Sequence, residues 1–486
     1  MVALVVASAL AGCASRIVND GARDAATAVD AGAVDLAPTV DGLFGNVTIA
    51  PIDRDSATIY NIYPQLYSQA GTLAAVTKDL PRIRDLGFDT IYLFPVTPIG
   101  SATFNHPSFG SPYCVHDYYA VSETLGSDMD LLTLVRTAHS LGLHVILDEV
   151  LNDTGWDNGL VALHPEYYLH NDGDPENLDS IEQAFDFADV AQLDYRTTGN
   201  GTAQFMVDML VYWIATFDID GFRFANADDP AGSGRMIPAS FWQALRPQLE
   251  ATKPGIFLLG EAEDPDLADV PFDLDYGWVL QGLNGAGGLQ QVANGASATL
   301  LQSAWMAQKS GYPADVRHMT LLQDWDLAAD VQLYGGVANT LAAATFNFTI
   351  DGLPMLFNGE EVGNDRSGVN TRMPIDWNGP DAATFTAFYK SLLALRNGNP
   401  ALQQGAVGWI ANSAPDQVVS YTRSSGAATF LVVINFANGA VSGTLSGLGA
   451  GSWSDVSPVG SPGGTQHSAP PAFNLAAYDF AVFRKQ

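Results

Sequence analysis

The sequence predicts a (β/α)8 TIM barrel with a small excursion after its third strand and a C-terminal antiparallel β-sandwich domain. Short β-branched or aromatic runs alternate with helical patterns from about residue 57 onward. Hairpin signals between these runs are few, which favours parallel strands. Past residue 399 the composition changes to Gly, Ser, Ala and Val. The 486 residues are enough for more than one domain.

Eight strands are expected in the barrel, which we place at residues 46–399. The predicted strands are 57–62, 90–94, 144–148, 219–224, 256–260, 272–278, 319–323 and 353–357. The clearest helical segments between them are 73–86, 131–141, 203–216 and 238–251. Each strand is followed by a helix or by room for one, so a closed parallel barrel fits better than a doubly wound sheet.

Two further segments complete the predicted architecture. The gap from residue 152 to about 191 is too long for a simple strand-to-helix loop and is rich in Asp, Asn, His and Tyr. It predicts a small excursion domain at about 153–191. Residues 400–486 hold strand-like runs at 418–422, 429–435 and 478–483 with turn residues between them, which indicates an antiparallel β domain.

The composition limits the function classes. There are 21 Lys and Arg against 53 Asp and Glu, which gives a net charge of −32. So negative a surface repels nucleic acid and anionic lipid, and it suits neutral or cationic ligands, Ca²⁺ included. The two cysteines exclude a disulfide framework and a Cys-based zinc site. We expect Cys114 to be a buried, inert thiol.

The N-terminus predicts export. Residues 2–12 form an apolar run too short to span a bilayer as a helix, and they end in Leu-Ala-Gly-Cys13, which resembles the bacterial lipobox. We therefore expect a lipoprotein signal at 1–13, lipidation of Cys13 and a flexible tether at 14–45. The alternative is an ordinary secretory signal that happens to contain a cysteine. Ala14, in place of an Asp, favours the outer membrane or cell surface of a Gram-negative bacterium.

Charged residues gather where predicted strands end. Asp148 and Glu149 end the third strand, Arg223 lies in the fourth, Glu261 follows the fifth and Asp326 follows the seventh. Barrel enzymes carry their working groups at the C-terminal ends of strands. Carboxylates and an arginine at one barrel mouth suit acid/base chemistry on an uncharged substrate, and glycoside cleavage fits. The alternative is that these acids only cap strands in a very acidic protein.

From about residue 57 onward, the sequence resembles the α-amylase family, glycoside hydrolase family 13. The matching segments are IYP (62–64), IYLFP (91–95), PYCVHDYY (112–119), PMLFNGEE (354–361), RMPIDW (372–377) and the tail 401–436. The resemblance implies the same barrel with a C-terminal β domain. It also implies activity on α-glucans or maltooligosaccharides by a retaining mechanism.

The resemblance assigns three catalytic roles. Glu261 matches the general acid/base, Asp326 the carboxylate that stabilises the transition state, and Arg223 the arginine that orients the nucleophile. The nucleophile itself should follow Arg223 by two residues, and that residue is Ala225. Alternation along a strand places Arg223 and Ala225 on one face and Asp220 on the other, so no neighbour takes over the role easily.

The remaining matches concern substrate and metal. Tyr113 matches an aromatic platform under the reacting sugar and Asp148 a substrate-side aspartate. Asp153 and Trp325 stand where the family has histidines that donate hydrogen bonds to sugar hydroxyls. A carboxylate cannot donate such a bond, and the ring of Trp325 is largely apolar. Asn152 matches a calcium ligand, and Asp194 lies where further ligands occur, so Ca²⁺ is a candidate cofactor. A capping Asn and a turn Asp are the alternative.

Two functions remain open. The first is an α-amylase-family glycoside hydrolase whose retaining chemistry is atypical or impaired because position 225 is alanine. The second is a non-catalytic, carbohydrate-binding surface lipoprotein, a pseudoenzyme, since binding needs the cleft but no nucleophile. A purely structural scaffold fits less well, because Glu261 and Asp326 are both retained. Whether the protein is an enzyme is therefore undecided at this level.

Overall fold

The computed structural model describes residues 47–100, 110–185, 187–228, 237–268, 271–282, 287–365, 373–464 and 466–486. The predicted signal with Cys13 and the tether at 14–45 lie outside these residues, as does Arg372. The chain forms two compact units. The first holds Thr72–Lys78, Leu93–Glu261 and the described part of Met1–Ile52, and the second holds Asp53–Gly71, Asp79–Tyr92 and Ala262–Gln486. In the described part, no helix is long and apolar enough to cross a membrane.

Eight parallel strands make up a nearly closed barrel, which confirms the predicted fold class. They are β1 Ile59–Ile62, β2 Thr90–Leu93, β3 His144–Glu149, β6 Gly221–Phe224, β7 Phe257–Gly260, β8 Asp275–Tyr276, β9 His318–Thr320 and β10 Leu353–Phe357. The sixth barrel strand, β8, is much shorter than the predicted 272–278, because Gly277 already caps the helix that follows it. The seventh, β9, ends three residues before the predicted position.

Each unit contains one ladder of the barrel strands. In the first unit the order is β7-β6-β3, and in the second it is β2-β1-β10-β9-β8. Asp148 of β3 pairs in register with Arg223 of β6, and Arg223 pairs with Leu259 of β7. Residues paired in register on parallel strands point to the same face of the sheet. Asp148 and Arg223 are therefore neighbours on one face.

Helices follow the strands as predicted. Their bounds are α3 Pro64–Tyr67, α4 Leu73–Leu86, α5 Asp128–Ser140, α7 Thr202–Phe217, α8 Ala239–Thr252, α9 Trp278–Gln281, α10 Leu289–Ala293, α11 Thr299–Gln308, α12 Asp330–Leu333, α13 Val337–Thr349, α14 Ala382–Asn397 and α15 Pro400–Gln404. Helix α5 begins three residues earlier than predicted. A capping box between Ser127 and Asp130 satisfies the free N–H groups of its first turn, so the helix extends back to Asp128.

The excursion is closed by a short antiparallel pair. Strands β4 (Asp153–Gly155) and β5 (Val190–Gln192) pair with Asp153 opposite Gln192. Between them lie α6 (Gly159–Leu163) and the short 3-10 helices η1 (Pro165–Tyr167) and η2 (Leu178–Ser180). Cys114 packs with Ala184 and Val190 in a small core, and its Sγ lies 3.3 Å from the carbonyl of Asp189. The prediction that Cys114 is buried is confirmed, and burial raises the pKa of its thiol to about 12, which disfavours the reactive thiolate.

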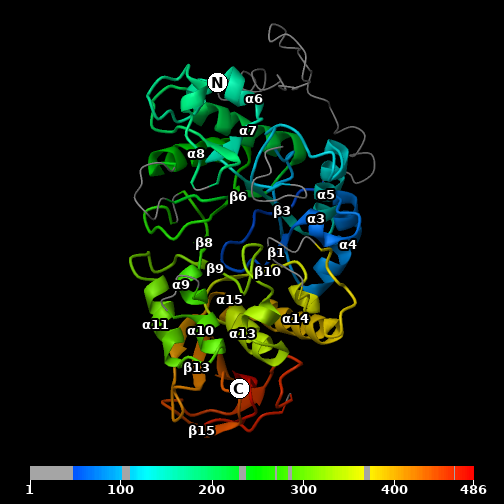
Figure 1. Cartoon of the computed structure of the whole chain (residues 1–486). Coiled ribbons are helices and arrows are strands. Elements are labelled where there is room, and N and C mark those ends of the chain that lie inside the picture. Colours follow the sequence, from blue (N-terminus) through cyan, green and yellow to red (C-terminus); the bar gives the residue numbers. More distant parts are fainter. Residues whose placement is uncertain are drawn as a thin grey trace. The chain divides into compact units, whose positions relative to one another are not determined.

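The C-terminal residues form antiparallel sheets (Figure 1, orange to red). One sheet has the order β11-β13-β14-β18-β16 and the other β12-β15-β17. Their bounds are β11 Ala406–Trp409, β12 Ala411–Asn412, β13 Val418–Ser425, β14 Ala428–Asn435, β15 Val441–Ser446, β16 Trp453–Asp455, β17 Ala472–Leu475 and β18 Phe480–Lys485. Side chains from both sheets share one apolar core, among them Leu431, Phe473 and Phe483.

A buried histidine ties the long β16–β17 loop to the domain. His467 Nδ1 lies 2.8 Å from Asp455 Oδ2, and Nε2 lies 3.4 Å from both Asp479 Oδ1 and Ser461 Oγ. Ser461, His467 and Asp455 have the connectivity of a serine-hydrolase triad. However, carboxylates on both ring nitrogens make the imidazole a double donor. It therefore holds a charge and is no free base.

This cluster predicts a pH-dependent contribution to stability. Burial alone would lower the pKa of His467, but hydrogen bonds to Asp479 and Asp455 raise it above the usual value. The stabilisation is therefore complete below the unfolded pKa of about 6.5 and is lost as pH rises through the higher folded pKa. Measured by urea unfolding of the whole chain, the stability lost in His467→Gln should be larger at pH 5.5 than at pH 9. An equal loss at both pH values would contradict the assignment.

Candidate functional site

Three neighbouring strands of the first unit bring the predicted polar residues together. Asp148 lies in β3, Arg223 in β6, and Glu261 directly after β7. Gly221 allows β6 and β7 to approach, because a Cβ at this position would lie 2.3 Å from the carbonyl oxygen of Phe257. The close approach sets Arg223 between the two carboxylates.

Arg223 bridges two carboxylates. Its side chain is 3% exposed, and Nη1 donates to both oxygens of Asp148 at 2.9 and 3.1 Å. Its Nη2 lies 2.9 Å from Glu261 Oε1. The hydroxyl of Tyr113 donates to Asp148 Oδ2 at 2.8 Å, and the Tyr113 ring centroid lies 5.9 Å from the guanidinium carbon. Both Asp148 oxygens are therefore engaged.

A methyl group occupies the predicted nucleophile position. Ala225 is 2% exposed, its N–H donates to the carbonyl of Glu149, and its own carbonyl accepts from Asn152 Nδ2 at 2.7 Å. Asp220, on the opposite face of the strand, binds His139 of α5 and Lys253 after α8, each at 2.8 Å. No carboxylate of β6 can thus replace the one missing at 225.

Glu261 is held by two donors. Oε1 faces Arg223, and Oε2 accepts the backbone N–H of Asn226 at 2.7 Å. The Glu261 side chain is 20% exposed, so solvent or a ligand can reach it. Each oxygen of the Glu261 carboxyl group therefore faces its own donor.

The predicted metal ligands differ in their fit to a cation. Asn152 Nδ2 donates to the carbonyls of Ala225 and Asn226, and its buried Oδ1 has no hydrogen-bond partner. A free amide oxygen suits Ca²⁺. Asp194 Oδ1, in contrast, accepts the N–H groups of Arg196 and Thr197, which is the alternative turn role. Within the described ranges, no group of three or more His, Cys, Asp or Glu side chains could hold a metal.

Asp153 is buried in the first unit. It is 6% exposed, and its Oδ1 has no hydrogen-bond partner. Burial, with the nearby charge of Asp189 as the smaller cause, raises the pKa of Asp153 well above its usual value. The environment thus favours the protonated form more than the sequence alone predicts. A protonated carboxyl group can donate a hydrogen bond, which a carboxylate cannot.

Asp326 and Trp325 belong to the second unit, on the loop that follows β9. Asp324 Oδ1 accepts the N–H of Asp326 at 3.0 Å, and the Trp325 ring meets Tyr63 edge-on with centroids 6.4 Å apart. The loop ends at Asp330, whose N–H donates to the Gln323 side chain. Burial raises the pKa of Asp330 to about 7. Both predicted residues thus lie on a loop that is fastened at its two ends.

The contact between Asn226 and Glu261 was not predicted from the sequence. Asn226 adopts φ of 46°, the left-handed region that few L residues enter, and its N–H reaches Glu261. Asn is the non-glycine residue that tolerates this conformation best. An Asn directly after the strand end was therefore the signal that could have located this turn.

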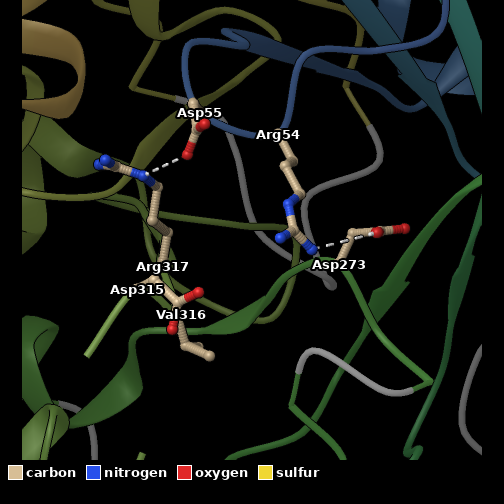
Figure 2. A pocket seen from close by; sticks show the side chains of 6 residues that line it. All are labelled: Arg54, Asp55, Asp273, Asp315, Val316 and Arg317. Carbon is tan, nitrogen blue, oxygen red and sulfur yellow. Dashed lines mark hydrogen bonds and ion pairs between the residues drawn. The ribbon is translucent and has the colours of Figure 1, made fainter. Parts of the chain in front are cut away.

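A polar hollow in the second unit lies at the other ends of the strands (Figure 2). Its lining residues are Arg54, Asp55, Asp273, Asp315, Val316 and Arg317. These residues precede β1, β8 and β9 in the sequence. Arg317 Nε binds Asp55 at 3.1 Å, and Arg54 faces Asp273 at 4.0 Å. Charged residues paired at the N-terminal ends of barrel strands indicate a role in stability, not catalysis.

Several known proteins are similar to this chain in sequence. Residues 53–270 match the model of the alpha-amylase catalytic domain. A cyclomaltodextrinase of Geobacillus thermopakistaniensis (strain MAS1) is 28% identical over 76% of this chain and 62% of its own length. The alpha-amylase MalA of Haloarcula japonica is 25% identical over 80% of this chain and 56% of its own. The chain thus spans less than two thirds of these curated relatives.

Solved structures agree on the fold. The crystal structure of an alpha-amylase from Lactobacillus plantarum superposes with a TM-score of 0.75 at 24% identity, covering 89% of this chain and 99% of that one. A noncanonic maltogenic alpha-amylase, AmyB of Thermotoga neapolitana, gives 0.72 at 24% identity, with 89% and 96% covered. Residues 53–270 are thus similar in sequence to the alpha-amylase catalytic domain, and 89% of the chain shares the fold of these two structures.

Proposed function

We propose that this chain is an α-amylase-family glycoside hydrolase acting on α-glucans or maltooligosaccharides, with its retaining chemistry impaired at position 225. One observation carries the proposal: Arg223 bridges Asp148 and Glu261 beside an alanine. The acid, the arginine and the aspartate of a glycosidase site are thus assembled without the nucleophile. The names of the matched relatives, cyclomaltodextrinase and alpha-amylase, support an α-glucan substrate.

The chemistry follows from these groups. Glu261, once protonated, gives its proton to the glycosidic oxygen, and the electron pair of the breaking C–O bond leaves with the departing sugar. A carboxylate about 5–5.5 Å from the acid would then form the covalent intermediate, and a methyl group cannot. Loss of a nucleophile costs roughly 10⁴–10⁶ in rate, or about 5.5–8 kcal/mol of barrier.

Two nearby carboxyls do not replace the nucleophile as a base for water. Asp148 already accepts from Arg223 and Tyr113 through both oxygens. Burial raises the pKa of Asp153 well above its usual value, which disfavours the ionised form that a general base needs. Neither residue therefore takes over the role of the nucleophile readily, and turnover without a carboxylate at 225 should be slow.

A carbohydrate-binding protein without turnover is the second candidate. The same alanine at 225 favours it, together with Glu261 being engaged by Arg223 and by the N–H of Asn226. Binding needs a ring such as Tyr113 and polar groups for sugar hydroxyls, but no nucleophile. The two candidates predict different activities for a variant in which a carboxylate is restored at position 225.

The decisive comparison is between Ala225→Asp and its neutral match Ala225→Asn. We expect Ala225→Asp to release reducing sugar from maltooligosaccharides on the order of 10³-fold faster than the unaltered chain. This gain is below the full loss, because Asp153 and Trp325 still differ from the family. Ala225→Asn should show no gain. Thermal unfolding of each variant controls for folding.

The other outcomes are also informative. Turnover by the unaltered chain that disappears in Glu261→Gln would show a working but altered enzyme, and the product anomer would then define its stereochemistry. If no variant releases reducing sugar but maltooligosaccharides still bind, the binding protein is favoured. If there is neither turnover nor binding, both candidates are contradicted.

We also infer a Ca²⁺ site that includes the free Oδ1 of Asn152, with Asp194 as a candidate second ligand. Bound Ca²⁺ would fasten the start of the excursion. We expect EGTA to lower the thermal unfolding midpoint of the unaltered chain and to leave that of Asn152→Ala unchanged. Asn152→Asp keeps an oxygen ligand and should still respond. An unchanged midpoint in the unaltered chain would contradict the site.

A third inference concerns location: the protein is exported and lipid-anchored to the cell envelope through Cys13. The Leu-Ala-Gly-Cys sequence supports this. In a Gram-negative host, the full chain should sediment with membranes, and Cys13→Ser should move it to the soluble or secreted fraction. An unchanged distribution of Cys13→Ser would refute lipidation at this residue.

A further inference from the structure

The backbone at Asn226 is in an unfavourable conformation. Its φ of 46° lies in the left-handed region, which costs an L residue free energy unless surrounding contacts enforce it. The Asn226 side chain is exposed, so packing of that side chain does not explain the conformation. Strained residues of this kind cluster at functional sites.

Contacts from two strand ends enforce the turn. After β3, Asn152 Nδ2 donates to the carbonyls of Ala225 at 2.7 Å and Asn226 at 3.0 Å. After β7, the carbonyl of Glu261 accepts the N–H of Ala227 at 2.9 Å. The segment 225–227 is thus held from both sides, and the N–H of Asn226 between them has a fixed direction.

That N–H points at the predicted acid. It donates to Glu261 Oε2 at 2.7 Å, while Arg223 Nη2 lies 2.9 Å from Oε1. Arg223 reaches Glu261 through a long side chain, whereas the N–H belongs to a backbone segment, 225–227, that five other hydrogen bonds fasten. The backbone donor therefore fixes the orientation of the carboxyl group more firmly than the guanidinium can.

We propose that Asn226 is a positioning residue, whose left-handed turn aims a backbone N–H at Glu261 and sets the orientation of that carboxyl group. This rests on the proposed function only in taking Glu261 as the proton donor. The feature that matters is the backbone conformation and not the amide side chain. Glycine, which adopts positive φ freely, should therefore replace Asn226, and a β-branched residue should not.

The first test compares Asn226→Gly with Asn226→Val, in whichever of the unaltered chain and Ala225→Asp turns over. We expect Asn226→Val to lower kcat on the order of 10²-fold, at the lower end of what a general acid contributes, with KM changed less than about threefold. Asn226→Gly should recover kcat, and the pH–rate profile should shift only in Asn226→Val. Equal losses in the two variants would overturn the proposal.

The second test needs no turnover. Hydrogen exchange of the Asn226 amide, resolved to the single residue, reports its bond to Glu261 directly. We expect this amide to be protected in the unaltered chain and in Asn226→Gly, and to exchange at least about tenfold faster in Glu261→Ala. Unchanged exchange in Glu261→Ala would overturn the proposal even in an inactive protein. Absence of turnover in every variant would count against the proposed hydrolase alone.

Discussion

The ion pairs of Arg223 are the interaction on which the candidate site depends. A guanidinium that is 3% exposed needs carboxylate partners, because an unpaired buried charge costs several kcal/mol. The register of β3 against β6 supplies Asp148, and the approach of β7 over Gly221 supplies Glu261. Any change that shifts these strands by one residue would break both pairs and leave the charge buried without a partner.

The alanine at 225 changes what this arginine does. In the resemblance to the α-amylase family, the arginine serves a carboxylate two residues further along its own strand. Here its donors go to Asp148 and Glu261. The same group that would organise a nucleophile therefore holds the acid, so one missing carboxylate affects two parts of the reaction.

The charge of the protein also depends on the fold. The formal value of −32 counts every acidic residue as ionised. Yet burial raises the pKa of Glu149, Asp153, Asp330 and Glu360, and for Asp330 it reaches about 7. Burial therefore disfavours the ionised form of these four carboxyls, and we expect the folded chain to carry fewer negative charges than the formal count. The excess of acidic residues elsewhere remains large and unsuited to nucleic acid.

The sequence by itself determined the architecture and the strand ends at which the candidate site lies. Hydrophobic periodicity is a local property, so it located α4 at 73–86 and β10 at 353–357 with the bounds that the structure has. Strand ends in a parallel barrel share one face, so the order of the strands was enough to group Asp148, Arg223 and Glu261. The missing carboxylate at 225 was also evident, from the resemblance to the α-amylase family.

Only the tertiary structure decided how those residues are used. Asn152 was predicted as a metal ligand. In the structure its Nδ2 also donates to the backbone carbonyls of residues 225 and 226, and the first of these contacts spans 73 residues of chain. Asp153 was expected to be a carboxylate, and burial raises its pKa well above the usual value. The turn at Asn226 exists because two strand ends enforce it. Hydrogen-bond partners, dielectric environment and enforced strain arise from long-range packing, which local sequence patterns do not encode.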